Sequence, residues 1–204
     1  MTLSKRRATY RESLRQEILD AARELFVREG YEATSVRRIA DKVGCSSGIL
    51  YHYFEDKAAI MAQLVRETFH RLSERMQRMI EDPAPPLDRL RRALRTYIEF
   101  GVEHPHHYAV LFGEPKVPDN KIIEVFQTEG MHCFGCLQGL TAAAIAAGAL
   151  RPELADPAET AQALWASIHG LVSVLAICQG FPFVERTRLI ERQVDILIEG
   201  IRRR

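Results

Sequence analysis

Apolar residues recur at three- and four-residue spacing along almost the whole chain, and this periodicity constrains the fold more than any other feature. Ile18, Leu19, Ala22, Leu25 and Phe26 form the first such stripe, and Gly30 is placed to end that helix. No segment carries the alternating apolar and polar pattern of a strand. The sequence therefore predicts an all-α chain of about nine helices.

Local start and stop signals place the other helices. Thr34 is the expected N-cap of the second helix, and Asp156 followed by Pro157 is a strong start signal for the eighth. The predicted ranges are 35–43, 46–53, 57 to the prolines that begin at 83, 87–102, 106–112, 120–147 with a break near Gly130 or Gly135, 157–178, and a last helix after 182. We expect a head over residues 1–56 and a larger body over residues 57–204.

The composition describes an ordinary globular protein, because 47% of the residues are hydrophobic and 27% are charged. No apolar run approaches the roughly 18 residues that cross a bilayer, and no signal peptide opens the chain. We therefore expect a cytoplasmic protein with no membrane partner. The net charge of +1 does not by itself indicate nucleic acid. Basic residues nevertheless gather between Lys5 and Arg15, either as a phosphate-seeking arm or as a solvated tail.

The segment Thr34–Phe54 has the pattern of a helix-turn-helix. Ala40 is small enough for two helices to cross closely, and Gly44 tolerates the positive φ that the turn needs. Cys45 follows the turn at an inward position, which predicts a packing role instead of a reactive one. A plain pair of antiparallel helices shares these features. Apolar positions suited to packing the pair are Val36, Ile39, Val43, Leu50, Tyr53 and Phe54.

The second helix of such a unit presents its first residues to base edges in the major groove. Small side chains at its start let it approach the bases, and Tyr51 and His52 follow one turn later. We expect Thr34 and Lys57 to act as phosphate clamps. The candidate DNA-binding residues are Thr34, Ser35, Arg37, Ser46, Ser47, Gly48, Tyr51, His52 and Lys57.

Residues 10–60 resemble the DNA-binding domain of the TetR family of bacterial transcriptional regulators. The resemblance implies a homodimer that binds a roughly palindromic double-stranded DNA operator and responds to a small-molecule effector, most often as a repressor. The chain departs from the family pattern at Ile49 and Ser47. The matching residues are Ala22, Leu25, Phe26, Gly30, Tyr31, Thr34, Ile39, Ala40, Gly44, Gly48, Leu50, Tyr51, Tyr53, Phe54 and Lys57.

The body contains Trp165, His169 and Gly170, which resemble the tryptophan–histidine–glycine motif of one TetR subgroup. The resemblance implies an effector pocket among the central helices and pairing of the last two helices with the partner subunit. Any one of these aromatic residues also suits an ordinary core. The candidate effector-binding residues are Phe100, His104, Tyr108, Phe112, Phe126, Phe134, Trp165 and His169. The candidate dimer residues are Leu164, Ile168, Leu171, Leu175, Val194, Leu197, Ile198 and Ile201.

Three alternatives stay open. Cys133 and Cys136 are spaced like a zinc pair or a thiol switch, although the chain has no second such pair. An all-α enzyme is a second alternative, but no nucleophile–base pair or phosphate-binding loop stands out, so we expect no catalytic residues and no cofactor. A DNA-binding protein that is regulated by a protein partner is the third.

Overall fold

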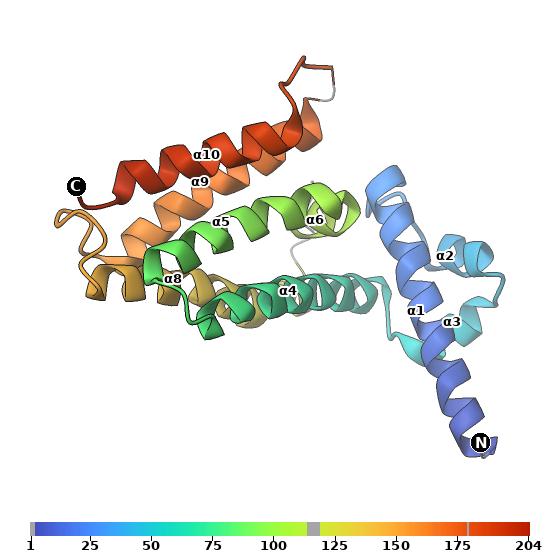
Figure 1. Cartoon of the computed structure of the whole chain (residues 1–204). Helices are drawn as coiled ribbons and strands as arrows, with labels where there is room; N and C mark the ends of the chain where they lie inside the picture. The colour runs from blue at the N-terminus through green and yellow to red at the C-terminus, as the bar shows by residue number, and fades with distance from the viewer. Residues whose placement is uncertain (1–2, 114–118, 179) are drawn as a thin grey trace. The chain divides into compact units, whose positions relative to one another are not determined.

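The computed structural model describes residues 3–113, 119–178 and 180–204, with side chains from residue 9 onward, and within these ranges it contains helices and no strand. The all-α prediction is confirmed. If the helical stretch from 120 to 146 is counted as one element, the described residues form the predicted nine helices. The elements are α1 (Leu3–Glu29), α2 (Val36–Val43), α3 (Ser47–Tyr53), α4 (Lys57–Glu81), α5 (Pro86–Glu103), α6 (Pro105–Phe112), α7 (Asn120–Val125), the π-helical turn η1 (Phe126–Gly130), α8 (Met131–Ala146), α9 (Pro157–Ile177) and α10 (Arg186–Ile201) (Figure 1).

Two of the predicted glycine positions end helices for the expected reason. Gly30 follows α1 with φ +89°, and Gly44 follows α2 with φ +78°, a region that side chains with a Cβ atom rarely adopt. The predicted break in the helix after residue 120 is also confirmed, since η1 separates α7 from α8 at Gly130. Asp156 caps α9, where its side chain accepts hydrogen bonds from the backbone of Ala158 and Glu159.

The expectation that Thr34 caps α2 is wrong. Ser35 is the N-cap, and its hydroxyl accepts a hydrogen bond from the Arg38 backbone nitrogen at 3.1 Å. Thr34 is 0% exposed and donates its hydroxyl proton to the Gly30 carbonyl at 2.8 Å. Its side chain therefore closes the turn between α1 and α2 and does not face solvent.

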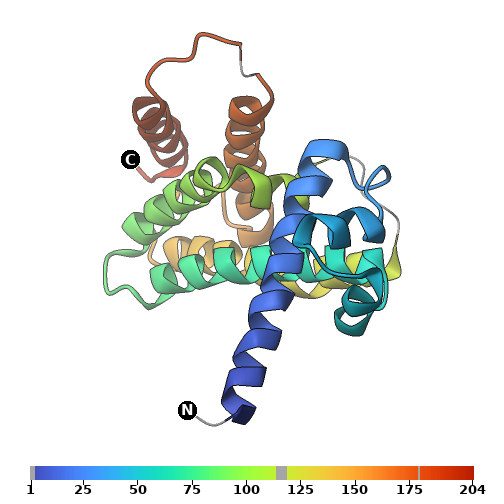
Figure 2. The ribbon, with the colours of Figure 1, turned by 90° about the vertical axis from the view of Figure 1, so that its right-hand side faces the viewer.

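α1 begins much earlier than the apolar stripe indicates. It is helical from Leu3, so the basic segment before Arg15 is neither an extended arm nor an unstructured tail. Figures 1 and 2 both show the first half of α1 continuing beyond α2 and α3. Burial of the stripe from Ile18 to Phe26 stabilises the helix, and the polar residues before it prolong it.

The described residues form two compact units. The first comprises the described residues 3–68, 106–113 and 119–128, and the second comprises the described residues 69–105, 129–178 and 180–204. α4 therefore contributes to both units, and α6 and α7 belong to the first. The predicted division between residues 56 and 57 concerns function, because it separates a DNA-binding head from an effector-binding body. It stays a prediction. Buried apolar residues of the first unit include Ile18, Leu19, Leu25, Ile39, Leu50, Ile60 and Leu64.

In the second unit, α5 packs against α8, α9 and α10. Leu164, Ile168, Val194 and Ile198 are buried within the single chain, so the prediction that these four residues meet a partner subunit is wrong. By length and composition, α9 is the one helix among the described residues that is apolar enough to cross a membrane, and 28% of that window is buried within the chain. Core helices of water-soluble proteins meet the same criterion, so this composition does not establish a membrane span.

Candidate nucleic-acid interface

α2, the turn at Gly44 and α3 form the predicted helix-turn-helix. Ser46 is the N-cap of α3, and its hydroxyl accepts a hydrogen bond from the Ile49 backbone nitrogen at 3.3 Å. Leu50 is fully buried and fixes one face of α3 on the core of the first unit. The other face of this helix is therefore available to a ligand. Of the predicted contact residues, Ser35, Arg37, Ser46, Gly48, Tyr51 and His52 are exposed, and Ser47 and Lys57 are half-buried.

Ile49 is a surface residue of α3 that the candidate set leaves out. It is 44% exposed, next to Gly48 and two positions before Tyr51, which is 54% exposed. An aliphatic side chain on a recognition helix can contact the C5-methyl group of thymine. The departure from the family pattern at position 49 is the sequence feature that could have identified this residue.

Lys57 already has partners in the protein. Its Nζ donates to the Tyr31 carbonyl at 2.8 Å and lies 4.1 Å from the centroid of the Tyr31 ring. Burial raises the pKa of the Tyr31 hydroxyl to about 12, so the phenol stays neutral beside the ammonium group. Lys57 thus ties the start of α4 to the beginning of the α1–α2 turn. A phosphate would have to compete with, or share, these contacts.

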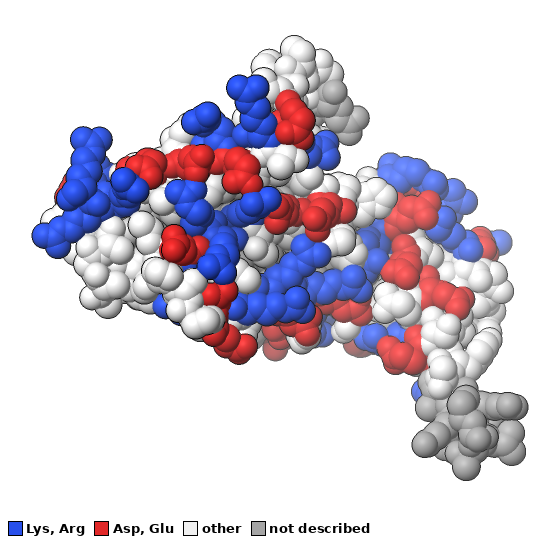
Figure 3. Space-filling view, in the orientation of Figure 1, with Lys and Arg blue, Asp and Glu red and all other residues white. Residues whose placement is uncertain are grey.

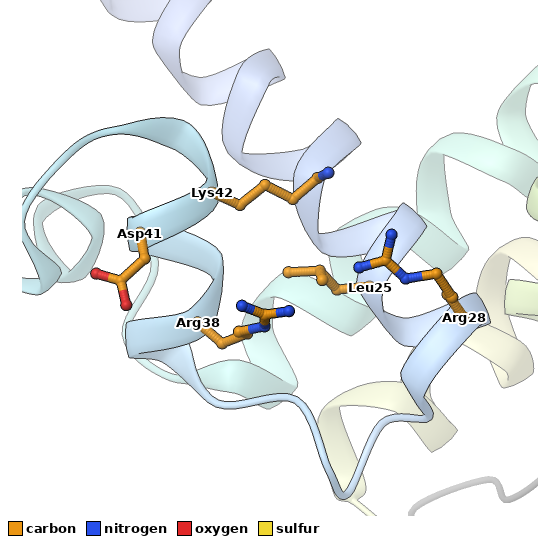
Figure 4. Close-up of a pocket in the computed structure, with 5 residues that line it drawn as sticks. All are labelled: Leu25, Arg28, Arg38, Asp41 and Lys42. Atoms are coloured by element: carbon orange, nitrogen blue, oxygen red, sulfur yellow. The ribbon is translucent and has the colours of Figure 1, made fainter.

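A shallow hollow of about 270 Å³ lies between the end of α1 and α2 (Figure 4). Arg28 from α1 and Arg38 from α2 point toward one another beside Leu25, whereas Asp41 points away. The lining residues are Leu25, Arg28, Arg38, Asp41 and Lys42.

The three cations of this hollow are balanced by Asp41 in its lining and by two carboxylates that pair with them. Glu29 lies 2.7 Å from Arg28 and 3.1 Å from Arg38, and Glu24 lies 3.0 Å from Lys42. Hydrogen bonds from Arg38 and then Arg28 lower the pKa of Glu29 to about 2. The hollow is therefore a set of ion pairs that holds α2 against α1, and its charge does not suit an anionic ligand.

Arg37 differs from these cations. It is exposed on α2, and it forms no ion pair with any carboxylate in the described part of the chain. Figure 3 shows basic and acidic side chains interspersed over the face in view, so positive charge is not concentrated there in one field. Arg37 is therefore a cation of the helix-turn-helix whose charge no described carboxylate offsets.

In the second unit, Trp165 and His169 meet at Tyr97 of α5. Trp165 Nε1 donates to the Tyr97 hydroxyl at 3.1 Å, and that hydroxyl lies 3.3 Å from His169 Nδ1. Phe134 packs edge-on against Trp165, with ring centroids 6.2 Å apart. Sequence reasoning missed Tyr97, whose hydroxyl joins two of the predicted effector-binding residues. These four residues (Tyr97, Phe134, Trp165 and His169) are called the aromatic cluster below.

The other predicted effector-binding residues fall into two groups. Phe100 is buried in the second unit and lies 5.3 Å, centroid to centroid, from His104, which accepts a hydrogen bond from Arg75 at 3.0 Å. Tyr108 and Phe112 pack on each other in the first unit at 4.8 Å, and Phe126 begins η1 there. Their role in effector binding stays a prediction.

Cys133 and Cys136 lie on the buried face of α8. Burial raises the pKa of the Cys133 thiol to about 11 and also raises that of Cys136, which suppresses the reactive thiolate forms. Within the described ranges, no group of three or more His, Cys, Asp or Glu residues is arranged to hold a metal ion. These observations do not favour the metal- or thiol-responsive alternative.

Comparisons with known proteins agree with this geometry. Residues 18–64 match the model of "Bacterial regulatory proteins, tetR family", and residues 90–197 match "Tetracyclin repressor-like, C-terminal domain". The chain is 28% identical, over 70% of its length and 70% of the relative's, to the HTH-type transcriptional repressor KstR2 of Mycolicibacterium smegmatis. It is 36% identical to the KstR2 repressor of Mycobacterium tuberculosis over 49% of its own length, and spans about half (50%) of that relative.

Solved structures share the fold. The ketosteroid transcriptional regulator KstR2 of Mycobacterium tuberculosis superposes with a TM-score of 0.70 at 24% identity, covering 93% of this chain and 95% of that one. The regulator FadR of Bacillus subtilis, solved with stearoyl-CoA, gives a TM-score of 0.77 at 22% identity, covering 91% of this chain and 98% of that one. The helix-turn-helix geometry and the two family models, one of which covers more than half of the chain, lead to one conclusion: the chain belongs to the tetR family of bacterial regulatory proteins and is a DNA-binding transcriptional regulator.

Proposed function

We propose that the protein is a homodimeric repressor that binds a palindromic operator through α3 and leaves it when a small apolar or amphipathic effector binds the second unit. The exposed face of α3, opposite the buried Leu50, is the observation that carries this proposal. The curated relatives KstR2 and AcnR are named repressors, which supports repression as the direction of control.

At the operator, we assign base contacts to the start and middle of α3, because the N-terminal residues of a recognition helix reach the base edges. Ser47 and Gly48 let the helix approach closely, Ile49 offers an aliphatic contact, and Tyr51 and His52 extend the contact by one turn. Ser35 and Arg37 are the phosphate contacts from α2. We leave Thr34 out, because its hydroxyl is buried and bonded to Gly30.

A homodimer is supported by apolar side chains that α9 and α10 leave uncovered. Ile177 is 79% exposed at the end of α9, and Ile196 is exposed on α10. Large exposed apolar side chains mark a surface that a partner subunit would bury. The residues of this apolar edge are Val174, Ile177, Phe181, Val184 and Ile196.

We assign the effector to the aromatic cluster. Its Tyr97 hydroxyl and His169 ring offer polar groups among apolar ones, which is the usual composition of a small-molecule site. The sequence Trp165–His169–Gly170 is also the part of the body that resembles the tryptophan–histidine–glycine subgroup. The effector must bind one of two conformations more tightly, since equal affinity for both would shift nothing. α4 contributes to both units and is the natural lever between these conformations.

The test starts from operator fragments selected from random DNA with the full-length protein. We expect one palindrome to be enriched. Tyr51→Ala should weaken binding to it. Ile49→Ala should change the base preference at one position of each half-site, on the order of fourfold, because one methyl contact is lost. Fatty acyl-CoA esters and steroid acids are then screened for release of the fragment. Trp165→Ala should abolish release and leave operator affinity unchanged. An unenriched pool, or release that is indifferent to Trp165, would contradict the proposal.

A further inference from the structure

Residues 9–17 of α1 form an extension that precedes both the buried apolar stripe and the segment matched by the family model, which begins at residue 18. Its side chains are exposed or half-buried. In Figure 2 the ribbon of the first part of α1 continues beyond those of α2 and α3. The α1 extension is therefore not needed to build the core of the first unit, and its surface is free to do something else.

Arg15 fixes the α1 extension against the end of α3. Its guanidinium lies 5.5 Å from the centroid of the Phe54 ring, and Phe54 is the C-cap residue of α3. The same guanidinium lies 3.8 Å from Glu67 of α4 and 3.8 Å from Glu12. Arg15 is thus held in place, and its charge is shared with two acids.

Arg11 lies one helical turn before Arg15, on the same face of α1. Its Nη2 is 3.4 Å from Nε2 of His52, an exposed residue of α3. A guanidinium only donates hydrogen bonds, so Nε2 of the imidazole is the acceptor in this contact. Within the described residues Arg11 forms no ion pair with a carboxylate, so its full positive charge lies beside the recognition helix.

We propose that Arg11 is a DNA contact supplied by the α1 extension: it binds a backbone phosphate next to the bases that α3 reads, and His52 holds its guanidinium in position. The inference rests on the proposed function, in which α3 enters the major groove. It adds a residue outside the helix-turn-helix to the DNA-binding surface. An arginine that is exposed, uncompensated and fixed on a helix suits a phosphate, because its donors keep their orientation when the anion arrives.

The experiment measures operator affinity of the full-length protein at several salt concentrations. The variants are Arg11→Ala, Arg11→Lys, His52→Ala and the double variant Arg11→Ala/His52→Ala. Arg78→Ala is the matched control, because Arg78 is exposed on α4 and forms no ion pair among the described residues. Tyr51→Ala reports separately on whether α3 binds DNA at all. Melting temperatures of all variants verify that the fold is intact.

We expect Arg11→Ala to weaken binding by roughly tenfold and to reduce the slope of log affinity against log salt by about one. Arg11→Lys should restore the slope, and Arg78→Ala should change neither quantity. The loss from Arg11→Ala should be smaller in the His52→Ala background, because the guanidinium is then already unsupported. An unchanged slope with Arg11→Ala, or an equal loss in both backgrounds, overturns the inference even though Tyr51→Ala still weakens binding. If Tyr51→Ala, His52→Ala and Arg11→Ala all bind like the parent protein, the proposed function itself fails.

Discussion

Lys121 Nζ donates a hydrogen bond to Asp56 Oδ2 at 2.7 Å and joins the first turn of α7 to the start of α4. The same ammonium lies 2.8 Å from Glu55. Asp56 also accepts a hydrogen bond from the Ala59 backbone nitrogen, so one carboxylate both stabilises the first turn of α4 and binds α7. The Lys121 hydrogen bond lowers the pKa of Asp56, and the two carboxylates raise the pKa of Lys121.

Lys121→Met should loosen α7 from the start of α4 without unfolding the protein. The pKa of Asp56 is below its unfolded value of 3.8, so its contribution to stability is complete above that value and is lost as the pH falls below it. The pKa of Lys121 is above its unfolded value of 10.5, so its contribution is complete below 10.5 and is lost at higher pH. Between roughly pH 5 and pH 9 we expect Lys121→Met to melt about 1–3 °C below the parent protein. This difference in Tm should shrink below about pH 4. Lys121→Arg is the control, and equal amide exchange rates in α7 of the two variants would contradict the prediction.

Lys57→Met should affect both stability and DNA binding. The ammonium donates a hydrogen bond to the Tyr31 carbonyl and makes a cation–π contact with the Tyr31 ring. The cation–π contact contributes about 0.5–1 kcal/mol to stability. We expect Tm to fall by roughly 2–4 °C and the salt slope of operator binding to fall by about one. A lower Tm with an unchanged slope would show that Lys57 is purely structural and makes no phosphate contact.

Glu67→Leu should destabilise the first unit. Glu67 lies 3.5 Å from Arg23, and both side chains are largely buried, so the variant leaves a buried guanidinium with Asp20 as its remaining ion-pair partner among the described residues. We expect a loss of about 2 kcal/mol, seen as a Tm lower by roughly 4–8 °C. Arg23→Met/Glu67→Leu should recover most of the loss, since apolar replacement removes both buried charges. If the double variant melts no higher than Glu67→Leu, the unpaired guanidinium is not the cause of the loss.

Ile177→Glu should dissociate the proposed homodimer. The residue is 79% exposed in the single chain, so the substitution costs the isolated subunit little, whereas a carboxylate within a subunit interface would be desolvated. Light scattering after size-exclusion chromatography should give the mass of one chain for this variant and of two for the parent. Met131→Glu, at an exposed methionine of α8, is the control. A variant that keeps the dimeric mass would move the interface elsewhere.

Cysteine reactivity should follow burial. Cys178 is exposed, whereas Cys133 is buried with a pKa of about 11, so only about one in a thousand Cys133 thiols is ionised at pH 8. We expect a disulfide reagent to modify Cys178 first and to reach Cys133 and Cys136 only when the protein unfolds. Operator affinity of Cys178→Ser should be insensitive to mild peroxide. Rapid modification of Cys133 in the folded protein would revive the thiol-switch alternative.

Features that depend on a few neighbouring residues could be predicted from the sequence. Gly30, Gly44 and Asp156 end or begin helices through their own backbone or side-chain chemistry, and all three were located correctly. Thr34 and Ser35 offered two adjacent hydroxyls for one cap. Which of them faced the core depended on the path of the turn, and local sequence does not contain that information.

Features that depend on distant residues could not be predicted. Tyr97 joins Trp165 and His169 across about 70 positions, which only the packing of α5 on α9 reveals. The two sides of α9 are similarly apolar, so the sequence did not distinguish the side that covers α5 from the side that stays uncovered. The helical start of α1 lacks an apolar stripe, and its charge pattern alone suggested an arm.

The ion pairs between α1 and α2 bear on how the protein would search a chromosome. Arg28, Arg38 and Lys42 are occupied by Glu24 and Glu29, so they contribute little attraction to arbitrary DNA. Affinity for random sequence sets the fraction of a regulator that is sequestered on the millions of competing genomic sites. A head that pairs these three cations with its own carboxylates keeps that fraction low. A small number of protein copies with only moderate operator affinity would therefore suffice to keep an operator occupied.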